Sequence, residues 1–580
     1  MKKMIPLLLA LTFALSACTS PSGSDSGAAE QENKQFTEYT NEYVAKVAEN
    51  SYTTMHQFFE NPQNYGIDPE KVEVTLGPIE PDEKTLALEE ELSSKLDTFD
   101  RNDLNPVQQD IYDQLQYEFD LSKETNDEKY KYLDNIWSTM NGLPASLVSF
   151  FSEYELREES DIAPLIQLIN DVPRYTQDAL DYSKKQAEHG TLMLDYEAMI
   201  ETCQTTLDSQ SDSAVRSELH KDVEELGLTQ ERTDQYIAQI DEALDQSFFP
   251  SYQTMIDGLT ALKDQIKPLS GLAALKNGKE YYELLVKDAT GTDDSINTIK
   301  NNIEDEISNV STQVVTMMND DPGTLADIMN LRTSFTNVED ILVFLNDHYT
   351  SQFPQLDSMV YDLQPLADEQ SQEGVVAYFM IPAVDSTSKY RIRYNRRDYG
   401  DDPGDISLYQ TLAHEGIPGH MYQAQYNKQH FQYTIQYFLS NSGFSEGYAT
   451  YVENQSLKFL DLDPKTVNMY VYNDLLNNYY VLLMDIAVNY EGMSKEEFTA
   501  HFDMFDSSAL EGIYDQLADN PGVFMSYYYG YYQISELRKE AKDKLENDFD
   551  DVKFNDALLQ SGSVNFDIVK RNIDTYMKED

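Results

Sequence analysis

Apolar residues recur three or four positions apart through most of the chain from about residue 36 onward, which is the spacing of one face of an α-helix. In one clear stretch, residues 237–248, bulky apolar side chains alternate with polar ones at this spacing. Pro250 interrupts the pattern, and a second stripe of the same kind covers residues 252–266 before Pro268 ends it. We interpret both stripes as faces that pack into a core.

Strand patterns are few, and the strongest covers residues 390–394, where apolar and arginine side chains alternate strictly. The sequence therefore predicts a mainly α-helical, multi-helical protein with a small β-sheet at about residues 380–395, near the active site. We expect an N-terminal helical region over residues 36–370 and a metal-binding catalytic region over residues 371–580. Glycine and proline are scattered too evenly to mark a firm boundary, so one continuous body is the alternative.

The N-terminus has the pattern of a targeting segment. Two lysines precede an apolar run over residues 5–15, which is too short to span a membrane as a mature helix. The run ends in Leu-Ser-Ala-Cys, which resembles the lipoprotein box of bacteria, with Cys18 as the residue that becomes lipidated. We expect a signal peptide over residues 1–17 and a flexible polar tether over residues 18–35. A simple secretory signal with an incidental cysteine is the alternative.

No later run is long and apolar enough to span a membrane. The lipid on Cys18 is therefore the only membrane attachment that we predict, and it places the protein on the extracytoplasmic face of the cell membrane. The chain has one other cysteine, Cys203, so a disulfide scaffold is excluded and we expect an inert buried thiol there.

The charge of the chain restricts the classes of partner that we expect it to bind. Its 580 residues include 42 Lys and Arg against 103 Asp and Glu, for a formal net charge of −61. A surface this acidic repels phosphate backbones, so nucleic acid is not an expected partner, whereas metal ions and basic peptides are attracted. The sequence predicts no oligomeric state.

Two of the eight histidines, His414 and His420, lie in the segment HEGIPGH. This is an expanded form of the zinc motif HExxH, in which the two histidines are four residues apart. A four-residue step on a straight helix leaves two side chains about 40° apart, whereas a six-residue step leaves them about 120° apart. Both histidines can therefore hold one ion only where the helix is distorted, and Gly416, Pro418 and Gly419 favour such a distortion.

The helix that carries the first of these histidines has a clear predicted start. The turn Pro-Gly-Asp ends in Asp405, an acidic N-cap. Leu408 and Leu412 then mark the buried side of the helix.

A catalytic zinc ion usually has a third protein ligand, and the segment that begins at Gly443 offers two candidates. Glu446 and Glu453 are seven residues apart and share one helix face. We predict Glu446 as the ligand and Glu453 as an acceptor for a ligand histidine, with the reverse assignment as the alternative. We expect Gly447 to let this helix approach the metal-binding helix closely.

These residues predict a hydrolytic site with one zinc ion per chain, although two imidazoles and a carboxylate also accept cobalt or manganese. The ion would polarise a scissile carbonyl and acidify the attacking water. Glu415 would take the proton of the water and pass it to the leaving amine. Tyr527 is our first candidate for a donor to the oxyanion, and Tyr528 is the second.

Four arginines, at positions 391, 393, 396 and 397, lie shortly before the metal motif. Arg391 and Arg393 share one face of the predicted strand, which we expect at a sheet edge where substrate backbone can bind. Arginine suits a carboxylate, so this pair would favour cleavage near a free C-terminus. Neutralisation of nearby acids is the alternative.

The two motifs together resemble the bacterial domain of unknown function 885 family, whose members pair HExxPGHxxQ-like and EGWAxYxE-like stretches. Here they read HEGIPGHMYQ, with Gln423 in place, and EGYATYVE, with Tyr448 where tryptophan is usual. Two further segments, NGKEYYELLV and SYYYGYYQISELR, fit the same family, and the resemblance covers about residues 270–580. It implies an all-helical, gluzincin-like metallohydrolase, often a peptidase, and does not fix a substrate.

We therefore predict a lipid-anchored, extracytoplasmic zinc metallopeptidase whose substrate is a peptide. A metal-dependent amidase acting on a non-peptide or cell-wall amide would share every catalytic residue. A non-catalytic surface binding lipoprotein is the second alternative, although a pure binding site has no use for Glu415. The sequence does not distinguish cleavage at the ends of peptides from cleavage in the middle.

Overall fold

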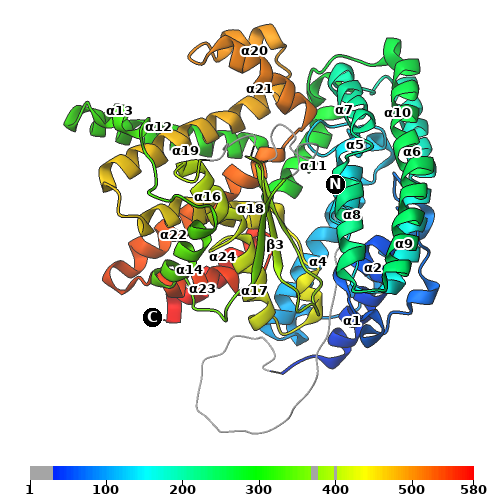
Figure 1. Ribbon diagram of the computed structural model, residues 1–580. Helices are drawn as coiled ribbons and strands as arrows, with labels where there is room; N and C mark the ends of the chain where they lie inside the picture. The colour runs from blue at the N-terminus through cyan, green and yellow to red at the C-terminus, as the bar shows by residue number, and fades with distance from the viewer. Residues whose placement is uncertain (1–30, 367–375, 397–401, 580) are drawn as a thin grey trace.

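The computed structural model describes residues 31–366, 376–396 and 402–579, and helices form most of this part of the chain (Figure 1). The mainly α-helical prediction is confirmed. The helices before the sheet are α1 (Lys34–Asn50), α2 (Tyr52–Phe58), α3 (Glu83–Leu96), α4 (Pro106–Thr125), α5 (Leu143–Ser152), α6 (Ile162–His189), α7 (Tyr196–Asp208), α8 (Ala214–Glu225), α9 (Gln230–Ala243), α10 (Phe249–Leu262), α11 (Gly278–Thr290), α12 (Ile296–Asp320), α13 (Thr324–Ile328) and α14 (Glu339–His348).

The helices after the sheet are α16 (Ile406–Glu415), α17 (His420–His430), α18 (Ser442–Ser456), α19 (Pro464–Ile486), α20 (Lys495–His501), α21 (Ser507–Asp519), α22 (Gly530–Leu545), α23 (Asp551–Leu559) and α24 (Phe566–Glu579). Three turns are π-helical: η6 (Leu244–Phe248), η13 (Ala487–Glu491) and η14 (Met525–Tyr529). Short 3₁₀ turns are η1 (Pro62–Tyr65), η2 (Pro69–Lys71), η3 (Arg101–Asp103), η4 (Glu128–Tyr130), η5 (Glu159–Asp161), η7 (Lys263–Gln265), η8 (Leu272–Ala274), η9 (Tyr349–Ser351), η11 (Thr434–Tyr437), η12 (Leu457–Phe459) and η15 (Glu546–Asp548).

The predicted interruption at Pro250 is a π-helical turn and not a break. The chain runs from α9 through η6 into α10, because the amide of Phe249 bonds the carbonyl of Leu244 five residues back. Pro250 lies directly after this turn, at the start of α10, and its missing N–H leaves one hydrogen bond of the continuous helix unmade. The second helix ends at Leu262, earlier than the predicted end at Pro268.

Three strands form the sheet in the order β1–β3–β2, with β1 (Tyr361–Pro365) parallel and β2 (Ala377–Met380) antiparallel to β3 (Tyr390–Tyr394). The strand predicted over residues 390–394 is therefore confirmed. Its predicted edge position is wrong, because β3 is the central strand of the sheet in the described residues. In Figure 1 the sheet lies between the helices α5–α10, in cyan to green, and the helices of the C-terminal half, in yellow to red.

One large apolar core joins both halves of the chain, and its buried members run from Phe36 in α1 to Met577 in α24. A smaller apolar cluster, which includes Phe498 and Leu510, packs the projecting helices α20 and α21. The boundary predicted near residue 370 falls in residues 367–375, outside the described residues.

The predicted signal peptide and the lipidation site at Cys18 also lie outside the described residues. Helix α1 begins at Lys34, two residues inside the predicted tether. Across the part of the chain that the structure describes, no helix combines the length and the apolar character needed to cross a membrane. Cys203 is a buried free thiol.

Candidate metal centre

The metal motif is divided between two helices. Helix α16 ends at Glu415 and α17 begins at His420, so the expected distortion is a complete break over residues 416–419. The ψ angles of Gly416 and Gly419, −103° and −133°, lie outside the helical range. The turn is compact, because the amide of Gly419 donates to the carbonyl of Ala413 at 2.9 Å.

Glycine is required at position 419 by a close approach of the backbone. A Cβ atom there would lie 1.7 Å from the carbonyl oxygen of His414. The start of α16 is as predicted: the Asp405 carboxylate accepts from the amides of Ser407 and Leu408 at 2.7 and 3.4 Å. The HEGIPGH segment therefore turns back on itself between α16, whose N-terminus Asp405 caps, and α17.

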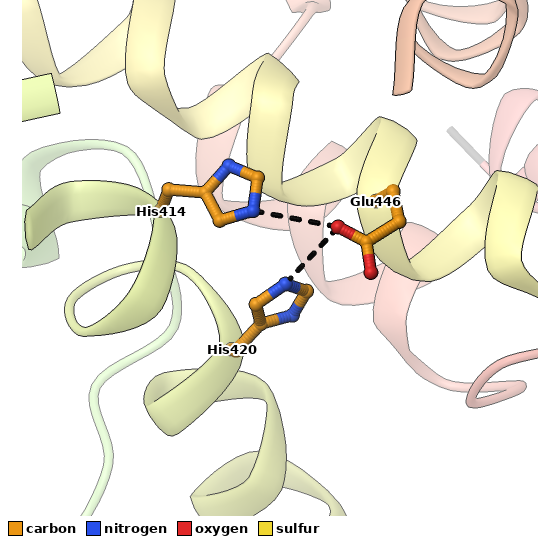
Figure 2. A group of neighbouring side chains, drawn as sticks. All are labelled: His414, His420 and Glu446. Carbon is orange, nitrogen blue, oxygen red and sulfur yellow. Dashed lines mark ion pairs between the residues drawn. The ribbon is translucent and has the colours of Figure 1, made fainter. Parts of the chain in front are cut away.

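This fold brings the two histidines together with Glu446 of α18 (Figure 2). The Nε2 atoms of His414 and His420 each lie 3.4 Å from Oε2 of Glu446. One ligand atom from each residue lies within 4.8 Å of the others. Two imidazole nitrogens and a carboxylate oxygen are a donor set of catalytic zinc sites, so these side chains fit such an ion.

Glu453 lies on the other side of the His414 ring. Its Oε1 atom accepts a hydrogen bond from Nδ1 of His414 over 2.6 Å. A proton held on Nδ1 leaves the lone pair of Nε2 free for a metal ion. Glu446 thus lies among the candidate ligands and Glu453 contacts the far side of the His414 ring, while the assignment of one glutamate to the metal stays a prediction.

Glu415 follows His414 directly and is buried beside the candidate ligands. Its Oε1 lies 3.9 Å from Nε2 of His414, and the backbone amide of Phe379 in β2 faces the carboxylate and acts to lower its pKa. Burial raises the pKa of Glu415 above its ordinary value, whereas the neighbouring histidines act against that rise. A carboxylate with a raised pKa is suited to accept a proton and then to release it.

Tyr527, in the π-helical turn η14, also lies beside the two histidines. Its ring lies 6.1 Å from that of His414, at an interplanar angle of 19°. The charge of Glu446, together with burial, raises the pKa of Tyr527 well above its ordinary value, so the hydroxyl keeps its proton. Tyr528 instead stacks on Phe524, with ring centroids 5.9 Å apart.

The π-helical turn η14 is a feature that no sequence pattern predicted, and such turns are frequent at functional sites. It packs against α18, the helix of Glu446, and so turns Tyr527 toward the histidines. Gly447 does not serve the purpose that we predicted. A Cβ atom there would lie 2.4 Å from the backbone of Gly530, so this glycine allows α18 to approach α22 and not the helices of the two histidines.

Arg391 and Arg393 lie on β3 as predicted, but acids already contact both. Arg393 is buried, with Nε 3.4 Å from Glu153 and Nη1 3.2 Å from Asp362. Arg391 lies 3.8 Å from the same Glu153. These ion pairs connect the end of α5 to the sheet and correspond to the alternative of charge neutralisation, and a substrate-binding role stays a prediction. Arg397 lies outside the described residues.

Two further groups near the centre were missed by the sequence analysis. The amide of Phe379 is a backbone group, which no residue pattern identifies. Asp474 of α19 lies near Glu453, and burial raises the pKa of its carboxyl to about 6. Asp474 has the pattern of any polar residue on an amphipathic helix, so only the fold shows that it is half-buried beside Glu453.

A comparison of the chain with known protein families finds a match, and the matched region includes both motifs. A family profile described as "Bacterial protein of unknown function (DUF885)" matches residues 78–573. The chain belongs to the DUF885 family. The match begins well upstream of residue 270, where the resemblance of the motifs fades, so the family region includes most of the N-terminal helices. A comparison with curated proteins finds no match.

Two solved structures share the fold of this DUF885 protein. A candidate lipoprotein from Colwellia psychrerythraea is 16% identical with a TM-score of 0.80, and the alignment covers 94% of this chain and 99% of the other. A candidate lipoprotein of unknown function from Shewanella oneidensis is 16% identical with a TM-score of 0.61, and covers 92% and 99%. At this identity the likeness concerns the fold alone.

Proposed function

We propose that this DUF885 protein is a zinc-dependent peptidase that hydrolyses peptide bonds. The observation that carries the proposal is the meeting of His414, His420 and Glu446, with their ligand atoms within 4.8 Å of one another, beside the buried carboxylate of Glu415. A bound zinc ion supplies Lewis acidity to the scissile carbonyl and acidifies the attacking water.

The side chains of the chain then have separate roles. Glu453 holds the proton on Nδ1 of His414 and so keeps Nε2 turned toward the ion. Glu415 takes the proton of the attacking water and passes it to the leaving amine. Tyr527 keeps its own proton and donates a hydrogen bond to the oxyanion of the tetrahedral intermediate.

The position of β2 supports a peptide as the substrate. Within the described residues, β2 pairs only with β3, and the amide of Phe379 on its other side points to Glu415. A free strand edge binds an extended peptide through backbone hydrogen bonds. A peptide on this edge would pass directly over the proposed general base.

The proposed location is the extracytoplasmic face of the membrane, with a lipid on Cys18 as the anchor. It rests on the Leu-Ser-Ala-Cys box and on the two structural neighbours, which are described as candidate lipoproteins. Metabolic labelling with a fatty acid tests it: the wild-type chain takes up label, and Cys18→Ser does not.

The function is tested with a mixed library of peptides, incubated with the purified protein and analysed by mass spectrometry. We expect cleavage that a chelator stops, that added zinc restores and that Glu415→Gln abolishes. Glu536→Gln, at a glutamate of α22 paired with Lys539, is the matched control and should leave cleavage unchanged. Cleavage that survives both the chelator and Glu415→Gln would refute the proposal, and the same library reports whether the ends or the middle of peptides are cut.

A further inference from the structure

Three basic side chains gather on the far side of α18 from the metal centre. Gln455 of α18 is nine residues from Glu446 and thus about 180° around the helix from it. Lys458, in η12 directly after α18, donates a hydrogen bond from Nζ to Oε1 of Gln455. The other two basic side chains, Arg538 and Lys542, come from α22.

Arg538 and Lys542 are one helical turn apart and share one aromatic ring. The Arg538 guanidinium lies 5.4 Å and the Lys542 ammonium 5.1 Å from the ring centroid of Phe549. Two cations over the same ring repel each other in the absence of an anion between them. Lys542 is exposed, and partial desolvation together with the charge of Arg538 lowers its pKa below the ordinary value.

Lys458 is affected in the same way. Lys458 is exposed, and partial desolvation, followed by the charges of Arg538 and Lys542, lowers its pKa to about 8. Among the described residues, Asp551 is the carboxylate that opposes these three positive charges, and it forms an ion pair with Arg538. The buried Nε of Arg538 has no hydrogen-bond acceptor.

The cluster therefore keeps an excess of positive charge in a chain whose formal net charge is −61. Repulsion among three positive charges costs free energy, and an anion between them removes that cost. A guanidinium beside two ammonium groups matches a compact oxyanion with two negative charges.

We propose that Lys458, Arg538 and Lys542 form a binding site for a phosphate-type oxyanion, separate from the metal centre. The oxyanion comes either from free phosphate, with up to two negative charges, or from the singly charged phosphodiester of an anionic lipid headgroup, since both present charged phosphate oxygens.

Isothermal titration of the full-length protein with sodium phosphate, at an ionic strength matched with sodium chloride, tests the site. We expect one phosphate per chain in the wild type and affinity reduced about tenfold or more in Lys458→Gln and in Lys542→Gln, because each loses a charged hydrogen bond. Lys539→Gln is the matched control, since Lys539 lies on the same helix but pairs with Glu536 at 2.8 Å. It should bind phosphate as the wild type does.

A second titration distinguishes the sources, with dihexanoyl phosphatidylglycerol below its micelle concentration and dihexanoyl phosphatidylcholine as the neutral comparison. Binding of phosphate alone identifies free phosphate, and binding of the anionic lipid but not the neutral one identifies a headgroup. The proposal is overturned if neither ligand binds, or if Lys539→Gln weakens binding as much as the cluster variants do. If Lys458→Gln and Lys542→Gln bind phosphate as tightly as the wild type does, the phosphate binds at the metal centre, and this result also overturns the proposal.

Discussion

Glu453 accepts the Nδ1 proton of His414 at 2.6 Å, while Glu446 lies 3.4 Å from the opposite nitrogen of the same ring. The two glutamates of one helix face therefore hold one imidazole from both sides. On the proposed function, this relationship makes Glu446 the candidate metal ligand and Glu453 the residue that orients His414.

Substitution of each glutamate separates the role of a metal ligand from that of a residue that orients His414. Glu453→Gln should weaken zinc binding about 10- to 100-fold, because Glu453 orients the His414 ring by a hydrogen bond and does not itself bind the ion. Glu446→Gln should weaken zinc binding more. Competition with a fluorescent chelator measures both affinities. A larger loss in Glu453→Gln than in Glu446→Gln would reverse the assignment.

Glu415→Gln should keep the zinc affinity of the wild type and lower turnover about 100- to 10,000-fold, which is the usual contribution of a general base. The amide has nearly the same shape as the carboxylate but accepts no proton at neutral pH. Zinc content and peptide cleavage are measured on the same preparation. A variant that still turns over at the wild-type rate would exclude Glu415 as the base.

Tyr527→Phe should lower kcat about 100- to 1,000-fold with little change in KM, because the hydroxyl contacts the substrate oxygen only as negative charge develops on it. Tyr528→Phe is the matched control, one residue along the same turn, and should remain near the wild type. The assignment fails if the two variants have equal activity.

Gly419→Ala should destabilise the protein by about 1–3 kcal/mol, since the turn must move away from the new methyl group. Zinc affinity should fall with it, because the same turn sets the position of His420. In Gly512→Ala, a Cβ atom meets nothing within 4 Å on the exposed side of α21, and the change should stabilise by about 0.5–1 kcal/mol. Denaturant unfolding measures both. Gly419→Ala that unfolds like the wild type would contradict the account of the turn.

A buried acid of α19 makes the stability of the protein depend on pH. Burial raises the pKa of Asp485 to about 7, whereas an unfolded aspartate titrates near 4. Between these values the folded chain holds a proton that the unfolded chain has lost. The stabilisation from this proton is thus full below about pH 4 and is lost as the pH rises through 7.

Asp485→Asn removes this titration, so the variant should lose less stability than the wild type between pH 5 and pH 7, by about 1 kcal/mol per pH unit. Urea unfolding at both pH values measures the difference, with Asp503→Asn at an exposed site as the control. Parallel losses in the wild type and Asp485→Asn would exclude the titration of Asp485.

Local patterns predicted the helices, the strand β3 and the N-cap at Asp405, because each depends on neighbours in the sequence. The meeting of His414 and Glu446 could also be predicted, since ligand types and spacing restrict it. The contact of Gly447 with Gly530 and the central position of β3 could not, because both depend on which distant segment packs alongside. The same holds for η14 and for the ion pairs of Arg393.

The most direct test of the central claim is anomalous diffraction from crystals grown with zinc, measured on both sides of the zinc absorption edge. The account predicts one strong anomalous peak per chain, from a zinc ion within bonding distance of Nε2 of His414, Nε2 of His420 and a carboxylate oxygen of Glu446. A peak at other residues, or none at this centre in protein saturated with zinc, would contradict it.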